Sequence, residues 1–125
     1  MKCVVITGSR NWSDEEAILQ MFLREGKVDL VIHGDAKGAD RISGELAASM
    51  VGTQILRMPA QWNDNGRAAG PMRNSQILIV ACALRKCGWE VICEAFPDEK
   101  SVGTIDMMEK MKLAEFEVTN NGYQG

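Results

Sequence analysis

The chain has 125 residues, of which 46% are hydrophobic and 25% are charged, and its net charge at pH 7 is −3. This length suits one domain with its own core, and the composition excludes a disordered, collagen-like or coiled-coil chain. The acidic balance argues against a dedicated nucleic-acid-binding protein, whose footprint is usually basic. No apolar run reaches the roughly 20 residues of a membrane span, and the N-terminus reads as a strand rather than a signal peptide. We therefore expect a cytoplasmic protein without a membrane partner.

Four cysteines are spread over the chain, and His33 is its only histidine. A structural zinc site needs four nitrogen or sulfur ligands, usually in close pairs, and no C-x-x-C pair occurs. We therefore expect buried free thiols and no metal site. A catalytic pair such as Cys93 with His33 has suitable residue types but no supporting motif. For His33, at the end of a buried strand, we expect a structural role with a hydrogen bond.

The chain begins with a strand followed by a helix. Residues 3–7, CVVIT, form an apolar run rich in β-branched residues, which is typical of a buried strand. Ser13 and Glu16 form an S-x-x-E capping box, which predicts a helix that starts near Asp14. Gly26 is the predicted end of this helix.

A second strand and helix follow at once. The strand covers residues 29–33, and the glycine-containing loop G-D-A-K-G covers residues 34–38. The next helix runs from about residue 39 to Gly52, because its apolar residues recur at helical spacing. Residues 53–58 form the third strand.

A long polar stretch over residues 59–70 comes next, and a third helix is predicted to begin near Pro71, a residue favoured in the first helical turn. Basic residues followed by Gly88 end that helix. The remaining elements are predicted as a strand at 90–96, a helix at 101–113, a short strand at 115–118 and a flexible tail at 119–125.

Strands and helices thus alternate along one domain over residues 1–118. This alternation is typical of βαβ units with right-handed crossovers. We predict an α/β fold, a Rossmann-like three-layer sandwich whose mainly parallel sheet has four or five strands. Ligands of such sheets bind beyond the carboxyl ends of the strands, so the loops there are the candidate site.

Three of those loops combine glycine, small residues and hydroxyls at a helix start: T-G-S-R at residues 7–10, G-D-A-K-G-A-D at 34–40 and S-V-G-T at 101–104. Glycine lets backbone amides approach a ligand closely, and a helix N-terminus carries partial positive charge. Neither the P-loop nor the dinucleotide glycine motif is present. The loops together predict a cradle for the phosphate of a nucleotide.

The stretch over residues 59–74 adds a fourth candidate element. Trp62 either stacks on a base or pins the loop to the core. Arg73 is expected in the first turn of the third helix, where a cation opposes the helix dipole, and this favours a role facing an anionic ligand. Asp40 either caps the glycine loop or binds a ribose hydroxyl.

The segments H-G-D-A-K-G-A-D at residues 33–40 and P-A-Q-W…G-R-A-A-G-P-M-R-N at 59–74 resemble the YspA-like, YpsA-related branch of the SLOG superfamily, which also contains the DprA/Smf and Lonely Guy proteins. The resemblance covers about residues 2–113. It implies a Rossmann-like fold and a nucleotide pocket in a small bacterial or phage protein that senses or processes nucleotide signals. The positions matching its motifs are Gly8, Ser9, Arg10, Gly34, Gly38, Ala39, Asp40, Trp62, Gly70, Arg73, Asn74, Ser101, Gly103 and Thr104.

The resemblance implies as ligand a nucleoside monophosphate, ADP-ribose or NAD-type molecule, with no cofactor required. An alternative activity is that of a Lonely Guy-like nucleotide N-glycosidase, in which Arg73 holds phosphate and Asp106 or Glu109 stabilises the oxocarbenium-like centre. The Lonely Guy motif has a double glycine that this chain lacks. A DprA-like contact with single-stranded DNA has less support, because the chain is acidic. By analogy with related folds, we expect a homodimer or larger homo-oligomer.

Overall fold

The computed structural model describes all 125 residues. Five parallel strands form one sheet in the order β3-β2-β1-β4-β5, which confirms the predicted Rossmann-like α/β fold. The strands are β1 (Lys2–Gly8), β2 (Leu30–His33), β3 (Gln54–Arg57), β4 (Glu90–Phe96) and β5 (Glu117–Asn120). The helices are α1 (Glu15–Glu25), α2 (Ala39–Ala48), α3 (Trp62–Asn65), α4 (Ala69–Lys86) and α5 (Val102–Leu113), with a short 3-10 helix, η1 (Gly66–Ala68).

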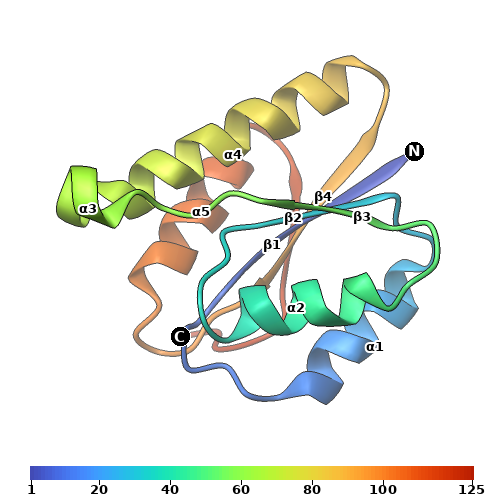
Figure 1. Ribbon diagram of the computed structural model, residues 1–125, viewed down its shortest axis with the longest axis horizontal. Coiled ribbons are helices and arrows are strands. Elements are labelled where there is room, and N and C mark those ends of the chain that lie inside the picture. Colours follow the sequence, from blue (N-terminus) through green and yellow to red (C-terminus); the bar gives the residue numbers. More distant parts are fainter.

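The helices cover the sheet from both sides: α1 and α2 lie on one face, and α4 and α5 lie on the other (Figure 1). The central strand β1 supplies both cores, because its side chains alternate between the two faces. Val4 and Ile6 pack in the cluster under α1 and α2, whereas Cys3 and Val5 pack in the cluster under α4 and α5. No helix is both long and apolar enough to cross a bilayer.

The carboxyl ends of β1 and β4 lie side by side, since Gly8 pairs with Phe96 in the parallel ladder. At Gly8 the start of α2 comes very close, because a Cβ there would lie only 2.4 Å from the Cβ of Ala39. Glycine at this position therefore brings the first turn of α2 against the end of β1. The loops after β1, β2 and β4 consequently meet at one edge of the sheet.

Two helix starts differ from their predictions. Asp14, not Ser13, is the N-cap of α1, and its Oδ1 accepts a hydrogen bond from the Ala17 amide at 3.1 Å. Aspartate caps a helix as well as serine does, so Asp14 takes the N-cap position that the capping box predicts for Ser13. Helix α4 begins at Ala69, two residues before Pro71, because η1 leads directly into it. Proline is tolerated there because the first four amides of a helix have no intrahelical acceptor.

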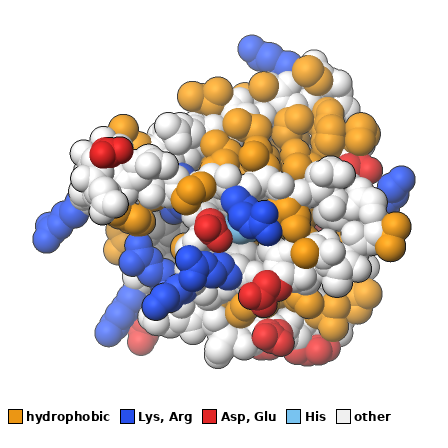
Figure 2. Space-filling model, in the orientation of Figure 1, with side chains coloured by type: hydrophobic (Ala, Val, Ile, Leu, Met, Phe, Trp, Pro, Cys, Tyr) orange, Lys and Arg blue, Asp and Glu red, His pale blue; other side chains and the backbone are white.

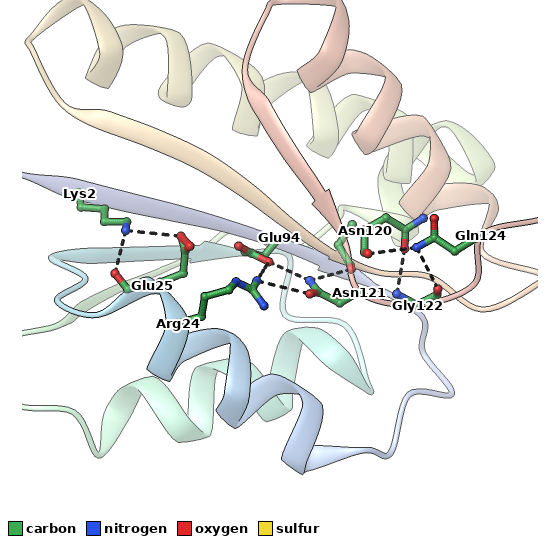
Figure 3. Close-up of polar contacts among 9 residues, drawn as sticks. Lys2, Arg24, Glu25, Glu94, Asn120, Asn121, Gly122 and Gln124 are labelled. Atoms are coloured by element: carbon green, nitrogen blue, oxygen red, sulfur yellow. Dashed lines mark hydrogen bonds and ion pairs between the residues drawn. The ribbon is translucent and has the colours of Figure 1, made fainter.

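The end of the chain is tied to the sheet through a buried carboxylate (Figure 3). Glu94 on β4 is only 1% exposed, and its Oε1 accepts hydrogen bonds from Arg24 Nη2 at 2.7 Å and Asn121 Nδ2 at 2.8 Å. The Asn121 amide also donates to the Ala95 carbonyl at 2.8 Å. The predicted domain boundary at residue 118 therefore falls inside β5, which continues to Asn120.

Candidate functional site

A cavity of about 530 Å³ lies at the carboxyl edge of the sheet. Its walls come from the loop after β1, the start of α2, the α3–α4 segment, and the loop that leads from β4 into α5. The volume falls in the range of roughly 300–1,000 Å³ that is usual for small-molecule sites. The predicted residues that line it are Gly8, Ser9, Arg10, Asp40, Trp62, Gly70, Arg73, Ser101, Gly103, Thr104 and Asp106.

The other predicted residues do not line this cavity. Gly34 lines an adjoining hollow, and Gly38, Ala39 and Asn74 lie behind the walls. Glu109 is exposed on α5, one turn beyond Asp106, and lines neither hollow. Of the two carboxylates predicted to stabilise a cationic centre, the structure thus brings only Asp106 to the cavity.

Gly38 joins the two glycine loops behind the cavity wall. Its φ is +79°, and a Cβ on it would lie 2.2 Å from the carbonyl oxygen of Ser9. The amide of Ala39, the next residue, donates to the same oxygen at 3.2 Å. The loop after β2 therefore rests directly on the backbone of the loop after β1, and only glycine allows this approach.

Three exposed cations stand at the cavity: Arg10, Arg67 and Lys100. The Arg10 guanidinium lies over the Trp62 ring, 5.2 Å from its centroid, which is a cation–π arrangement. Figure 2 shows Lys and Arg side chains gathered beside and below the α3 segment. The chain is acidic as a whole, but this part of its surface carries positive charge.

Asp98 introduces a carboxylate that the sequence analysis missed. It accepts hydrogen bonds from the hydroxyls of Ser9 and Ser101 and from the Lys100 amide, the last at 2.9 Å. These bonds, above all that from Ser9, lower the pKa of Asp98 to about 2. The sequence contains one signal for this role. Asp98 stands three residues before Ser101 at a helix start, and at that spacing the two side chains can form a hydrogen bond.

The N-terminus of α5 is open to the cavity. Ser101 occupies the N-cap position, but its hydroxyl bonds Asp98 and makes no capping bond to the helix amides. Asn74 on α4 fixes this end from behind, because its Nδ2 donates to the Gly103 carbonyl at 3.1 Å and to Asp106 Oδ2 at 3.0 Å. The amides of Gly103 and Thr104 in the first turn of α5 are thus available to an anion, whereas the Val102 amide already donates to the Lys100 carbonyl at 3.0 Å.

Asp106 carries a stable negative charge at the cavity. Burial alone would raise its pKa, but hydrogen bonds from Lys110 and Asn74 outweigh burial, so the pKa of Asp106 is lowered. Lys110 Nζ lies 2.6 Å from Asp106 Oδ2. This carboxylate suits stabilisation of positive charge rather than proton donation.

Arg73 lies in the second turn of α4, not the first, because the helix begins at Ala69. Its Nη1 donates to the Gly34 carbonyl at 2.8 Å, and its Nε donates to Asn74 Oδ1 at 3.0 Å. A Cβ on Gly34 would lie 2.0 Å from Nη1, so the arginine requires glycine there. Nη2 forms no hydrogen bond, and Arg73 lines both hollows.

Asp40 at the start of α2 is only 4% exposed. Its Oδ2 accepts the amides of Gly34 at 3.0 Å and Ala36 at 3.3 Å, which confirms the predicted bonds to the glycine loop. Its Oδ1 is buried and has no partner. Burial raises the pKa of Asp40 to about 6, despite these bonds and the nearby Arg73 charge.

His33 and Cys93 lie on opposite faces of the sheet. His33 is buried against Gly44 of α2, and its Nδ1 accepts the Asp35 amide at 2.9 Å, which confirms the predicted structural role. Cys93 packs in the cluster under α4 and α5, where burial raises its pKa to about 12. The two residues therefore form no catalytic pair.

A second hollow of about 530 Å³ adjoins the first. It is lined by the loop after β2 and by the segment that follows β3. Arg10, Trp62 and Arg73 line both hollows and so mark the boundary between them. The two hollows together offer room for a ligand with two parts.

The fold and the cavity define the class: a Rossmann-like parallel α/β protein with a polar cavity at the carboxyl edge of its sheet. The chain is similar to the Gene 61 protein of Mycobacterium phage D29, with 34% identity over 132 aligned positions that span 98% of each chain, and it belongs to the family of that phage protein. No protein-family model matches the sequence. A de novo designed protein with the PLOOP2X3_50 fold, solved in solution by NMR, has a TM-score of 0.49 and 16% identity, covering 98% of this chain and 83% of the designed one.

Proposed function

We propose that this protein binds a nucleotide or nucleotide-derived ligand in the cavity, as a sensor or processor of that ligand. The observation that carries the proposal is that separate loops of the sheet edge line one cavity. The T-G-S-R and S-V-G-T segments, which the sequence predicts to form a phosphate cradle together, line one cavity with Arg67 and Lys100. Free amides at a helix start and guanidinium groups are the donors that phosphate oxygens prefer.

The site residues and the SLOG resemblance support the same conclusion. Parallel α/β sheets bind nucleotides beyond the carboxyl ends of their strands, which is where this cavity lies. A nucleoside monophosphate fits the volume of the first hollow. An ADP-ribose or NAD-type ligand would extend past Trp62 into the second.

Thermal-shift and calorimetric titrations with AMP, ADP-ribose and NAD test this proposal. At least one of them should raise the melting temperature, because a ligand that binds only the folded state stabilises it by mass action. Arg10→Ala should weaken binding by roughly tenfold or more, since it removes a charge-assisted hydrogen bond. Lys27→Ala makes the same charge change at an exposed site outside both hollows and should bind as the wild type does. If no nucleotide stabilises the protein at millimolar concentration, the proposal is wrong.

A second candidate function is hydrolysis of the N-glycosidic bond of a nucleoside monophosphate. The observation that favours it is the ionised carboxylate of Asp106, which lines the same cavity and suits an oxocarbenium-like centre. Wild-type protein should then release free base from AMP, and Asp106→Asn should abolish the release while the protein still binds AMP. Absence of base release by the wild type would contradict this activity and leave the binding proposal intact.

A further inference from the structure

The most unusual group in the cavity is the carboxylate of Asp40. Its Oδ2 is satisfied by two backbone amides, whereas its Oδ1 is buried without any partner. An unpaired buried carboxylate oxygen is costly, and buried polar atoms in native proteins nearly always have a partner. Because Asp40 also lines the cavity, a hydrogen-bond donor on the ligand is a suitable partner for Oδ1.

Arg73 lies next to this carboxylate. Both side chains bond the backbone of Gly34: Asp40 accepts its amide, and Arg73 donates to its carbonyl. No direct ion pair joins the two side chains, and Arg73 Nη2 forms no bond of its own. At this wall of the cavity a buried, unpaired acceptor therefore lies beside a free donor, and a ligand that bonds Oδ1 must first displace the atoms that cover it.

We propose that Asp40 and Arg73 form a hydroxyl-binding subsite that takes a sugar hydroxyl of a ribonucleotide-type ligand. This inference rests on the proposed function and adds the feature of the ligand that the site selects. A hydroxyl donates one hydrogen bond and accepts others, so it matches Asp40 Oδ1 and Arg73 Nη2 together. An ionised phosphate oxygen only accepts, so it cannot satisfy Asp40 and is repelled by it.

The two walls of the cavity thus differ in what they bind. The wall near Lys100 and the α5 N-terminus offers an ammonium group and the amides of Gly103 and Thr104, which suit phosphate. The Asp40 wall suits a neutral hydroxyl. At neutral pH Asp40 is mostly ionised, because its pKa is raised only to about 6, and an ionised carboxylate is the stronger acceptor.

Calorimetry at pH 7.5 with AMP, 2′-deoxy-AMP and 3′-deoxy-AMP tests the inference. At least one deoxynucleotide should bind the wild type roughly 10- to 100-fold more weakly than AMP, the range for a hydrogen bond to a charged group. In Asp40→Asn this ratio should fall below about threefold, because the side-chain oxygen stays on the Gly34 and Ala36 amides and an uncharged amide group faces the ligand. Glu99→Gln, an equal charge change at an exposed residue outside the cavity, should keep the wild-type ratio.

Each outcome separates the inference from the function on which it rests. Equal binding of all three nucleotides by the wild type overturns the subsite. A ratio that persists in Asp40→Asn assigns the selectivity to another residue and overturns it as well. Binding of none of the three overturns the proposed function and the subsite together. Equal binding by the wild type overturns the subsite even if the variant does not fold.

Discussion

Substitution of Gly38 by alanine tests whether the two glycine loops hold each other in place. Gly38 and Gly26 have nearly the same backbone conformation, with φ and ψ of +79° and −129° at Gly38 and +75° and −130° at Gly26. A Cβ at Gly26 meets nothing within 4 Å, whereas a Cβ at Gly38 would lie 2.2 Å from the Ser9 carbonyl oxygen. The two substitutions therefore share the same backbone strain and differ only in the contact with the neighbouring loop.

The magnitudes follow from these two contributions. Gly26→Ala should lower the free energy of unfolding by about 1–3 kcal/mol, the usual cost of a residue in a conformation that favours glycine. Gly38→Ala should lose a further 1–3 kcal/mol or so, because overpacking forces the backbones apart and weakens the bond from the Ala39 amide to Ser9. Urea unfolding monitored by tryptophan fluorescence measures both values. Equal losses in the two variants would refute the reasoning.

Four other properties can be measured on the same protein. Asp40→Asn should raise the free energy of unfolding by about 2–3 kcal/mol at pH 8. Because the pKa of Asp40 is raised in the native state, the wild type loses this stability between about pH 4 and pH 6, so the gain of the variant is complete above about pH 6 and should vanish below pH 4. Asp98 has a lowered pKa, so it stabilises the fold above pH 4, and Asp98→Asn should flatten the loss of stability between pH 4 and pH 2. Arg24→Ala should cost about 2–4 kcal/mol and Glu94→Gln clearly less, because only the former leaves a buried carboxylate without its cation. Light scattering should give a multiple of 13.8 kDa if the expected homo-oligomer forms.

Each of these four predictions has an outcome that would contradict it. Equal stability of Asp40→Asn and the wild type at pH 8 would show that the ionised carboxylate does not destabilise the native state. If Asp98→Asn lost as much stability between pH 4 and pH 2 as the wild type does, the hydrogen bonds of Asp98 would make no contribution to stability. A larger loss in Glu94→Gln than in Arg24→Ala would contradict the argument that the buried carboxylate without its cation costs more than the exposed guanidinium without its anion. A monomer mass at all concentrations would exclude the oligomer.

The sheet and its helices were predictable because the signals for them are local. The strand over residues 90–96 agrees with β4, since a β-branched apolar run bounded by polar residues specifies a buried strand. The apolar segment within α4 reads as either strand or helix by itself, and the flanking proline and basic residues correctly favoured a helix. The alternation of elements then fixed the right-handed crossovers and the single sheet.

The elements that the sequence missed depend on contacts between distant residues. The predicted polar loop at 59–70 contains α3 and η1, and Trp62 is held there by Arg10 and packs beside Gly70. The predicted strand at 115–118 begins two residues later, because Glu115 has φ of +65° and makes the turn after α5. A non-glycine residue in this conformation gives no signal in the sequence.

The position of the candidate site was predictable, but its charge balance was not. Parallel topology brings the loops after β1, β2 and β4 to one edge, so the convergence follows from strand order. The side chain of Asp98 reaches Ser9, 89 residues away in the chain, and no periodicity reveals that bond. The unpaired oxygen of Asp40 is likewise visible only once three segments are packed around it.

The carboxylate of Asp98 gives the cavity a resident anion of its own. Before any ligand arrives, this group already bridges the segments that follow β1 and β4, so the mouth is pre-shaped and undergoes little reorganisation on binding. The same charge repels any anionic group placed directly beside it, so it restricts where the negative charge of a ligand can lie in the cavity.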